Sequence, residues 1–350
     1  MHAANVSGLA IAVFNGNQPV FSKTFGFANV PKKQAFTQSS VMYAASFAKM
    51  VFAYIAMQFV EEKIIDLDKP LYEYLEKPLT EYKIEGWKRG YQDLRNDDRY
   101  KKITARMCLT HTTGFPNWRW FEPDKKLKIK FEPGSRYSYS GEGLYLLQYI
   151  IERVSGKDYE SLCKERVFNP FIMTNTSQVW QRRFDSSICY GHNAKGEPYE
   201  LMKWTEASAG GSMSTTLPDF TKFYTALINN EGLSKKSLKQ MTSPQVRIKS
   251  RQQFGPLAQV DSTDNDGIQL SYGFGVGVFK TPYGRAFFKE GHDDGWGHYS
   301  VCFPDKKIAI IIMTNNDNGE SIFKELLAYT IADSFTPWQW ENYIPYDAVK

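Results

Sequence analysis

The chain has 350 residues, of which 42% are apolar and 23% are charged, and its formal net charge is +5. This composition predicts an ordinary globular protein with enough residues for one large domain or two. The 43 basic residues are spread along the chain and form no long block, which argues against a nucleic-acid-binding protein. The longest strongly apolar stretch near the C-terminus, residues 308–313, is far shorter than the roughly 20 residues of a membrane helix, so we expect no transmembrane segment.

The four cysteines are scattered without close pairing, which argues against a zinc cluster and against a redox pair. We expect buried free thiols, which leave the compartment open. No basic segment followed by an apolar one begins the chain, so we expect no signal peptide within it. The common metal-binding and phosphate-binding motifs do not occur, so we also expect no metal ion and no organic cofactor.

Two strands, residues 9–14 and 19–25, are predicted first and are joined by the turn Asn15-Gly16-Asn17. A strongly apolar helix is predicted from about residue 46, and residues 144–154 are the clearest helix of the helical and loop region that follows. Strand character returns at residues 272–280, 285–289, 299–303 and 307–314. A last helix is expected over residues 321–334.

Strands at both ends with helices between them predict an α/β (α+β) fold in which one sheet is assembled from the two termini. We expect residues 1–62 and 212–350 to form the sheet domain and residues 63–211 to form an inserted, mostly helical domain. A cleft between these two parts is the natural place for a functional site.

Ser46 and Lys49 stand three residues apart at the head of the apolar helix. Side chains at positions i and i+3 lie on one helix face about 5–6 Å apart at Cβ, so the amine of Lys49 can reach the hydroxyl of Ser46. Lys49 is the only charged residue between Ser46 and Val60. Burial disfavours an ammonium ion and lowers its pKa, which would make Lys49 a base. The pattern therefore suggests a serine nucleophile activated without histidine.

The same spacing of serine and lysine occurs at Ser161 and Ser321. Charged neighbours in those two segments favour solvated helix faces instead. The simpler interpretation of Ser46 itself is a helix N-cap. From the local sequence alone, both interpretations of Ser46 stay open.

Further landmarks follow one another over about nine-tenths of the chain. They are residues 7–13, 25–28, the Ser46 helix, 103–106, Leu109-Thr110-His111-Thr112-Thr113-Gly114-Phe115-Pro116, Pro133-Gly134, Tyr139-Ser140, 209–215, Gly291-His292 and Met313-Thr314-Asn315. With these segments in this order, the chain resembles the serine β-lactamase and penicillin-binding-protein superfamily, specifically the branch of class C β-lactamases, DD-peptidases and esterases. The resemblance implies an antiparallel sheet with flanking helices, an inserted helical domain and Ser46 as the nucleophile.

The second motif of this family, Tyr-x-Asn, falls on Tyr139-Ser140-Gly141. The resemblance implies that Tyr139 is the catalytic acid and base, and cationic neighbours would have to lower its pKa from about 10 for work near neutral pH. The alternative is a packing aromatic residue. Gly141 replaces the asparagine of the family, so recognition of an acyl-amide side chain is in doubt. Glu142 is a candidate substitute, or a solvated glutamate.

The third motif, Lys-Thr-Gly or His-x-Gly, matches the segment that begins at Gly291 and His292. The resemblance implies that His292 shapes the electrostatics around Tyr139 and holds a substrate carboxylate or carbonyl; the alternative is a structural histidine. Asp294 replaces a small glycine and would repel the carboxylate of a penicillin. The resemblance also implies that the backbone amides of Ser46 and Gly295 form the oxyanion hole, although the alignment can be shifted by one residue.

Aromatic residues follow a family landmark at His111, which we interpret as structural support. Trp118, with Trp120 and Phe121, either walls the cleft and contacts substrate or belongs to the core. Both interpretations stay open.

These residues together predict a serine hydrolase that acts through a covalent acyl-enzyme on D-amino-acid peptides, small esters or β-lactams. The departures at Gly141 and Asp294 favour a peptidase or esterase over an efficient β-lactamase. The alternative is a non-catalytic or very slow sensor or scaffold that binds cell-wall fragments; a sugar-binding protein is a weaker one. We expect a peptide or other small-molecule substrate and no nucleic-acid partner. Family habit suggests the periplasm or cell surface, with the cytoplasm not excluded, and the sequence does not define the oligomeric state.

Overall fold

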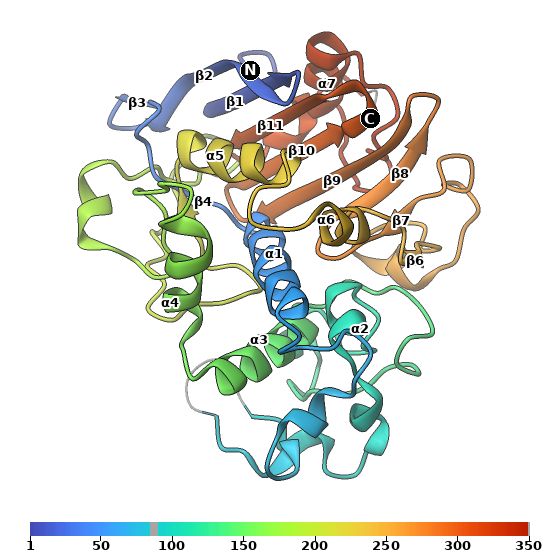
Figure 1. The fold of residues 1–350 in the computed structure, drawn as a ribbon. Helices are drawn as coiled ribbons and strands as arrows, with labels where there is room; N and C mark the ends of the chain where they lie inside the picture. Colours follow the sequence, from blue (N-terminus) through green and yellow to red (C-terminus); the bar gives the residue numbers. More distant parts are fainter. Residues whose placement is uncertain (85–89, 349–350) are drawn as a thin grey trace.

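The computed structural model describes residues 1–84 and 90–348 of the chain (Figure 1). Its centre is an antiparallel sheet of nine strands in the order β3-β2-β1-β11-β10-β9-β8-β7-β6. The strands are β1 (Gly8–Asn15), β2 (Gln18–Asn29), β3 (Gln34–Ala35), β6 (Val246–Arg247), β7 (Ser271–Tyr272), β8 (Gly277–Thr281), β9 (Gly284–Asp293), β10 (Trp296–Phe303) and β11 (Ile308–Thr314). A separate pair is formed by β4 (Met42–Tyr43) and β5 (Ser214–Thr215).

The two ends of the chain meet in the middle of this sheet. Strand β1 pairs with β2 on one side and with β11 on the other, and its register with β11 runs from Leu9 opposite Thr314 to Asn15 opposite Ile308. The turn before β2 holds Gly16 and Asn17, both at φ +62°, as a tight hairpin turn requires. The predicted fold class, a sheet assembled from both termini with helices around it, is therefore confirmed.

One predicted strand is wrong in its extent. Residues 272–280 form two short strands, β7 and β8, because the chain turns back between them. Gly275 in this turn has φ +72°, and a Cβ there would lie 2.5 Å from the Cβ of Ala53. Only glycine combines this backbone conformation with such a close approach to the helix, so the turn depends on it.

Helices lie on both faces of the sheet and in the helical region beside it. They are α1 (Phe47–Glu61), α2 (Ala105–Leu109), α3 (Gly141–Ser155), α4 (Tyr159–Cys163), α5 (Leu217–Ile228), α6 (Lys235–Met241) and α7 (Phe323–Ile331). The alternation of β11 separates two cores, because successive side chains of a strand point to opposite faces. Ile311 packs in the core that contains α1 and α5, whereas Ile310 packs in the core that contains Phe323 of α7.

Residues 63–84 and 90–211 supply no strand to the nine-stranded sheet and lie below and beside it in Figure 1, mainly in cyan and green. Helix α1 crosses between this region and the sheet. The division of the chain into two domains at residues 62 and 211 stays a prediction. No helix among the described residues is long and apolar enough to span a membrane.

Candidate active site

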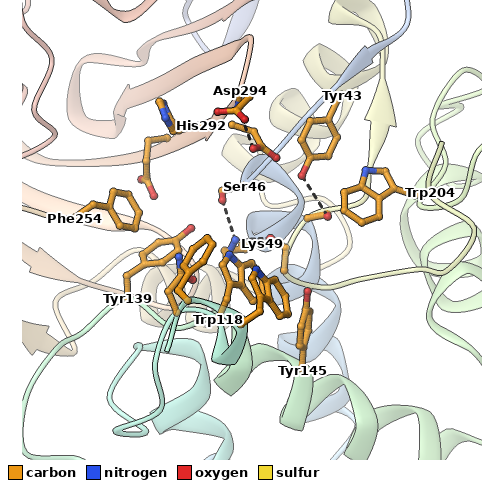
Figure 2. A pocket seen from close by; sticks show the side chains of 17 residues that line it. Tyr43, Ser46, Lys49, Trp118, Tyr139, Tyr145, Trp204, Phe254, His292 and Asp294 are labelled. Atoms are coloured by element: carbon orange, nitrogen blue, oxygen red, sulfur yellow. Dashed lines mark hydrogen bonds between the residues drawn. The ribbon is translucent and has the colours of Figure 1, made fainter. Parts of the chain in front are cut away.

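A cavity of about 850 Å³ opens beside the first turn of α1. Its walls come from α1, from the end of β9 and from loops of the helical region, and Figure 2 shows these side chains converging around Ser46. Sequence-predicted site residues that line it are Ser46, Lys49, Trp118, Tyr139, His292 and Asp294. Gly141, Glu142 and Gly295 are not among its lining residues.

Ser46 stands immediately before α1 but does not cap it. No side-chain hydrogen bond of Ser46 reaches the helix N–H groups, and its Oγ instead receives a hydrogen bond of 2.8 Å from Lys49 Nζ. The preceding residue, Ala45, has φ +46°, which is a strained conformation for a residue with a Cβ. The capping interpretation of Ser46 is therefore not supported, and the strained turn sets its hydroxyl at the edge of the cavity.

Lys49 is almost completely buried, with 1% of its surface exposed. Its Nζ also donates to the carbonyl of Gly210 and lies 5.6 Å from the ring centroid of Trp118. Burial lowers the pKa of Lys49 well below its ordinary value, and the charge of Lys289 lowers it further. This environment favours the neutral amine, which is the form that accepts a proton from Ser46.

Tyr139 packs against the same amine, with Lys49 Nζ 5.1 Å from the ring centroid of Tyr139. The hydroxyl of Tyr139 forms a hydrogen bond with Ser46. Burial raises the pKa of Tyr139 well above 10, and the charge of Glu290 raises it further. The expected lowering of this pKa by cationic neighbours is therefore wrong. The phenol keeps its proton, so Tyr139 is suited to donate a hydrogen bond or a proton, whereas Lys49 with its lowered pKa is suited to accept one.

Lys289 is a site residue that the sequence analysis missed. It is fully buried in β9, and its Nζ lies 3.4 Å from the hydroxyl of Tyr139 and 2.5 Å from Oε1 of Glu290. The available signal was the Lys-x-Gly pattern of residues 289–291, three positions before His292. Lys289 takes the place beside Tyr139 that we expected His292 to take.

His292 points elsewhere. Its ring is largely exposed, and Nδ1 makes a 2.8 Å ion pair with Oε1 of Glu320. The hydrogen bond that the imidazole donates to Glu320 raises the pKa of His292 to about 9, so the imidazole is charged at neutral pH. The charged imidazole contributes positive charge at the rim of the cavity. Its printed side-chain partner is Glu320 and not Tyr139.

The oxyanion-hole prediction is wrong for Gly295. Its backbone N–H donates to Oδ1 of Asp317 at 2.6 Å, so it is not free to hold an oxyanion. The N–H of Asp294 is also engaged, by Oδ1 of Asp293 at 2.9 Å. The backbone amide of Ser46 has no hydrogen-bond acceptor in the part of the chain that the structure describes. The role of the Ser46 amide in an oxyanion hole stays a prediction.

Trp118 explains the glycine at position 141. A Cβ on Gly141 would lie 2.1 Å from atoms of the Trp118 ring, so the indole occupies the space that a side chain there would need. Glu142 does not replace the missing asparagine, because it is fully buried in a bidentate ion pair with Arg119. Asn117, which the sequence analysis also missed, lines the cavity and accepts the N–H of Gly141 through its Oδ1 at 3.1 Å.

The remaining candidates have structural roles. His111 is buried, its ring lies 4.3 Å from that of Tyr139, and its Nδ1 is 3.0 Å from the carbonyl of Ser140, so it supports the loop that carries Tyr139. Ser161 donates to Asp158 on an exposed helix end. Ser321 donates to the carbonyl of Asn318. The described residues contain no cluster of histidine, cysteine and acidic side chains that could hold a metal ion.

Comparison with known proteins gives the family. The family model described as Beta-lactamase matches residues 1–332, and the chain belongs to this family. Penicillin-binding protein 4* of Bacillus subtilis (strain 168) is 26% identical over 351 residues, which cover 89% of this chain and 69% of that protein. The D-aminopeptidase of Brucella canis is 24% identical over 325 residues, which cover 90% of this chain and 57% of that protein. The chain thus spans little more than half of the second relative.

Solved structures agree on the fold. The octameric penicillin-binding protein homologue from Pyrococcus abyssi superposes with a TM-score of 0.72 at 20% sequence identity. The superposition covers 95% of this chain and 75% of that one. At this level of identity the likeness concerns the arrangement of the sheet and helices alone.

Proposed function

We propose that the protein is a serine hydrolase that works through a covalent acyl-enzyme on Ser46. The observation that carries this proposal is the 2.8 Å contact between Ser46 Oγ and the amine of Lys49, whose pKa burial lowers. A buried amine without a carboxylate partner has little structural value, but a neutral amine beside a hydroxyl is a general base.

The reaction would proceed in two halves. Lys49 takes the proton of Ser46 as its Oγ attacks the substrate carbonyl, and the backbone amide of Ser46 stabilises the oxyanion. Tyr139, which holds its proton, passes it to the leaving group, and Lys289 beside it balances the charge that develops on the phenol. Water then hydrolyses the acyl-enzyme by the same groups in reverse order.

The substrates that we propose are D-amino-acid peptides and small esters, with β-lactams as poor substrates or slow acylating agents. Relatives named as a penicillin-binding protein and a D-aminopeptidase support this range. Asp293 and Asp294 in the cavity disfavour the carboxylate of a β-lactam. A periplasmic or extracellular location belongs to this proposal, because cell-wall peptides are found there.

Labelling with a fluorophosphonate, followed by intact mass and peptide mapping, tests the nucleophile. We expect one adduct on Ser46, which disappears in Ser46→Ala and persists in the matched control Ser161→Ala. Incubation with a penicillin in the same assay separates the substrates: a lasting adduct indicates slow deacylation, and ring opening without adduct indicates β-lactamase activity. Labelling that survives Ser46→Ala would contradict the proposal.

A non-catalytic sensor of cell-wall fragments is the second candidate. It is favoured by one observation, the engagement of the Gly295 amide by Asp317, which leaves the oxyanion hole incomplete in this conformation. The sensor predicts binding of peptide fragments that is unchanged in Ser46→Ala, with no fluorophosphonate adduct on the parent protein.

A further inference from the structure

The segment after α7, residues 333–348, packs on the same face of the sheet as α7. Trp340 and Tyr343 of this segment belong to the same core as Phe323 of α7. The match to the family model ends at residue 332, so the segment lies outside the matched region. It carries Glu341 into this core, with only 6% of the residue exposed. The chain thus places an acid in its interior from a segment that the family model does not describe.

Glu290 of β9 points to the same side of the sheet. Side chains two residues apart in a strand share a face, and Phe288, two residues before Glu290, packs in the core just described. Glu290 is also opposite Tyr299 of β10, whose ring centroid is 6.0 Å from that of Tyr343. Glu290 therefore faces the side from which the C-terminal segment approaches.

Gln253 connects Glu290 with the residue before Glu341. Its Nε2 donates to Oε1 of Glu290 at 2.9 Å, and its backbone N–H donates to the carbonyl of Trp340 at 2.9 Å. The charge of Glu290 also acts on Glu341. A single residue therefore joins the two acids on one face of the sheet.

Three carboxyl oxygens of these two acids have no hydrogen-bond donor. Oε1 of Glu290 accepts from Lys289 and Gln253, but Oε2 of Glu290 and both oxygens of Glu341 are buried and have no partner among the described residues. Lys289 is the only cation of the described chain that forms an ion pair with either acid. Burying a carboxylate oxygen without a donor, or a second charge without a cation, is unfavourable. One proton on Glu341 relieves both, because a protonated carboxyl group is a donor.

The protonation of Glu341 matters for Tyr139. Burial raises the pKa of Glu341 well above its ordinary value, the charge of Glu290 raises it further, and the charge of Lys289 opposes them. After burial, the charge of Glu290 and, to a smaller extent, that of Glu341 raise the pKa of Tyr139. A neutral Glu341 leaves Lys289 and Glu290 as a balanced ion pair beside the phenol. An ionised Glu341 adds a negative charge that opposes proton release from Tyr139.

We propose that Glu341 is a positioning residue of the active site, a neutral acid that donates a hydrogen bond to Oε2 of Glu290 and so keeps Glu290 paired with Lys289 beside Tyr139. The inference rests on the proposed function, in which Tyr139 passes a proton to the leaving group. Glu341 keeps its own proton throughout the reaction, and it is not among the residues that line the cavity. When a rise in pH removes this proton, negative charge appears behind Tyr139 and acylation slows.

The other titratable groups that act on Glu341, or on which it acts, come from several elements. They are Lys289 and Glu290 of β9, Tyr299 of β10, Tyr272 of β7, Glu320 before α7, Tyr137 and Tyr139 before α3, and Tyr343 of the segment itself. Burial raises the pKa of each of the five tyrosines well above 10, so they stay neutral. Glu320 is paired with His292. The proton of Glu341 is thus the one that changes the charge behind Tyr139.

Infrared difference spectra between the parent protein and Glu341→Gln at pH 7 test for this proton and need no catalysis. We expect the C=O band of a protonated carboxyl group in the parent, which Glu341→Gln removes. Glu165→Gln, at an exposed carboxylate that pairs with Lys157 outside the cavity, is the matched control and should keep the band. A difference spectrum without this band overturns the inference, even where fluorophosphonate labels Ser46.

The pH profile of acylation separates a positioning role from a merely structural one. With the amide N-acetyl-D-alanine p-nitroanilide, the alkaline fall in kcat/KM should move up by about one pH unit or more in Glu341→Gln, which cannot ionise, and stay in place in Glu165→Gln. Glu341→Leu, which offers Glu290 no donor, should lower kcat/KM at pH 7 about tenfold, and Glu341→Gln should restore most of this loss. An alkaline fall at the same pH in the parent and in Glu341→Gln overturns the inference. Where the parent hydrolyses no amide, the proposed function fails and the infrared result alone decides on Glu341.

Discussion

The contact between Gly141 and Trp118 predicts a substitution whose effect on stability changes sign with its background. A Cβ at position 141 would lie 2.1 Å from the Trp118 ring, well inside van der Waals contact. Overpacking of this kind costs about 1–3 kcal/mol. Alanine also gains up to about 1 kcal/mol over glycine in a helix, and Gly141 is the first residue of α3. We therefore expect Gly141→Ala to destabilise the protein by about 1–2 kcal/mol.

Removal of the indole removes the clash but leaves the helical gain. In a Trp118→Ala background, Gly141→Ala should be neutral or stabilising by up to about 1 kcal/mol. Urea unfolding of the four proteins of this cycle measures both values. Gly267→Ala is the matched control, because a Cβ there meets nothing within 4 Å, and its effect should be the same in both backgrounds. Destabilisation by Gly141→Ala of equal size with and without Trp118 would refute the reasoning.

Two further predictions concern charge. Lys49→Met should lower the acylation rate about 10²–10⁴-fold, because it removes the base, and should leave far-UV circular dichroism unchanged; acylation at more than a tenth of the parent rate in stopped-flow labelling would exclude Lys49 as the base. Because the folded-state pKa of His292 is raised to about 9, above about 6.5 in the unfolded chain, the stabilisation by its pair with Glu320 is complete below about pH 6.5 and is lost as the pH rises through about 9. Since the His292 side chain is 60% exposed, we expect only about 1 kcal/mol, so Glu320→Gln should lower the free energy of unfolding by that amount near pH 6 and by almost nothing above about pH 10. A difference that grew with pH would contradict this assignment.

The local sequence was enough to predict the part of the site that lies on a single helix, α1. Ser46 and Lys49 share a helix, so their spacing and apolar surroundings were enough to bring the amine to the hydroxyl. Tyr139 required the family register, because its loop touches the helix only in the folded protein. Its pKa was predicted in the wrong direction, since burial and the charge of Glu290 outweigh the nearby amines.

The errors lie where distant segments compete for one group. The backbone N–H of Gly295 donates to Asp317, which lies in the loop after β11. No sequence pattern near Gly295 predicts this partner. Glu142 is neutralised by Arg119, which a loop brings over the start of α3. The Lys-x-Gly pattern at Lys289 was visible in the sequence, but its proximity to Tyr139 was not. Strand β9 and the Tyr139 loop come into contact only in the folded protein.

The pairing of β1 with β11 has a consequence for the synthesis of the protein on the ribosome. Leu9 can pair with Thr314 only after about 300 further residues have been synthesised. At a synthesis rate of 5–20 residues per second this delay is roughly 15–60 s. During that time the apolar edge of the β1–β2 hairpin has no strand to pair with, and such an edge invites pairing with other chains. The central sheet can close only after nearly the whole polypeptide has emerged.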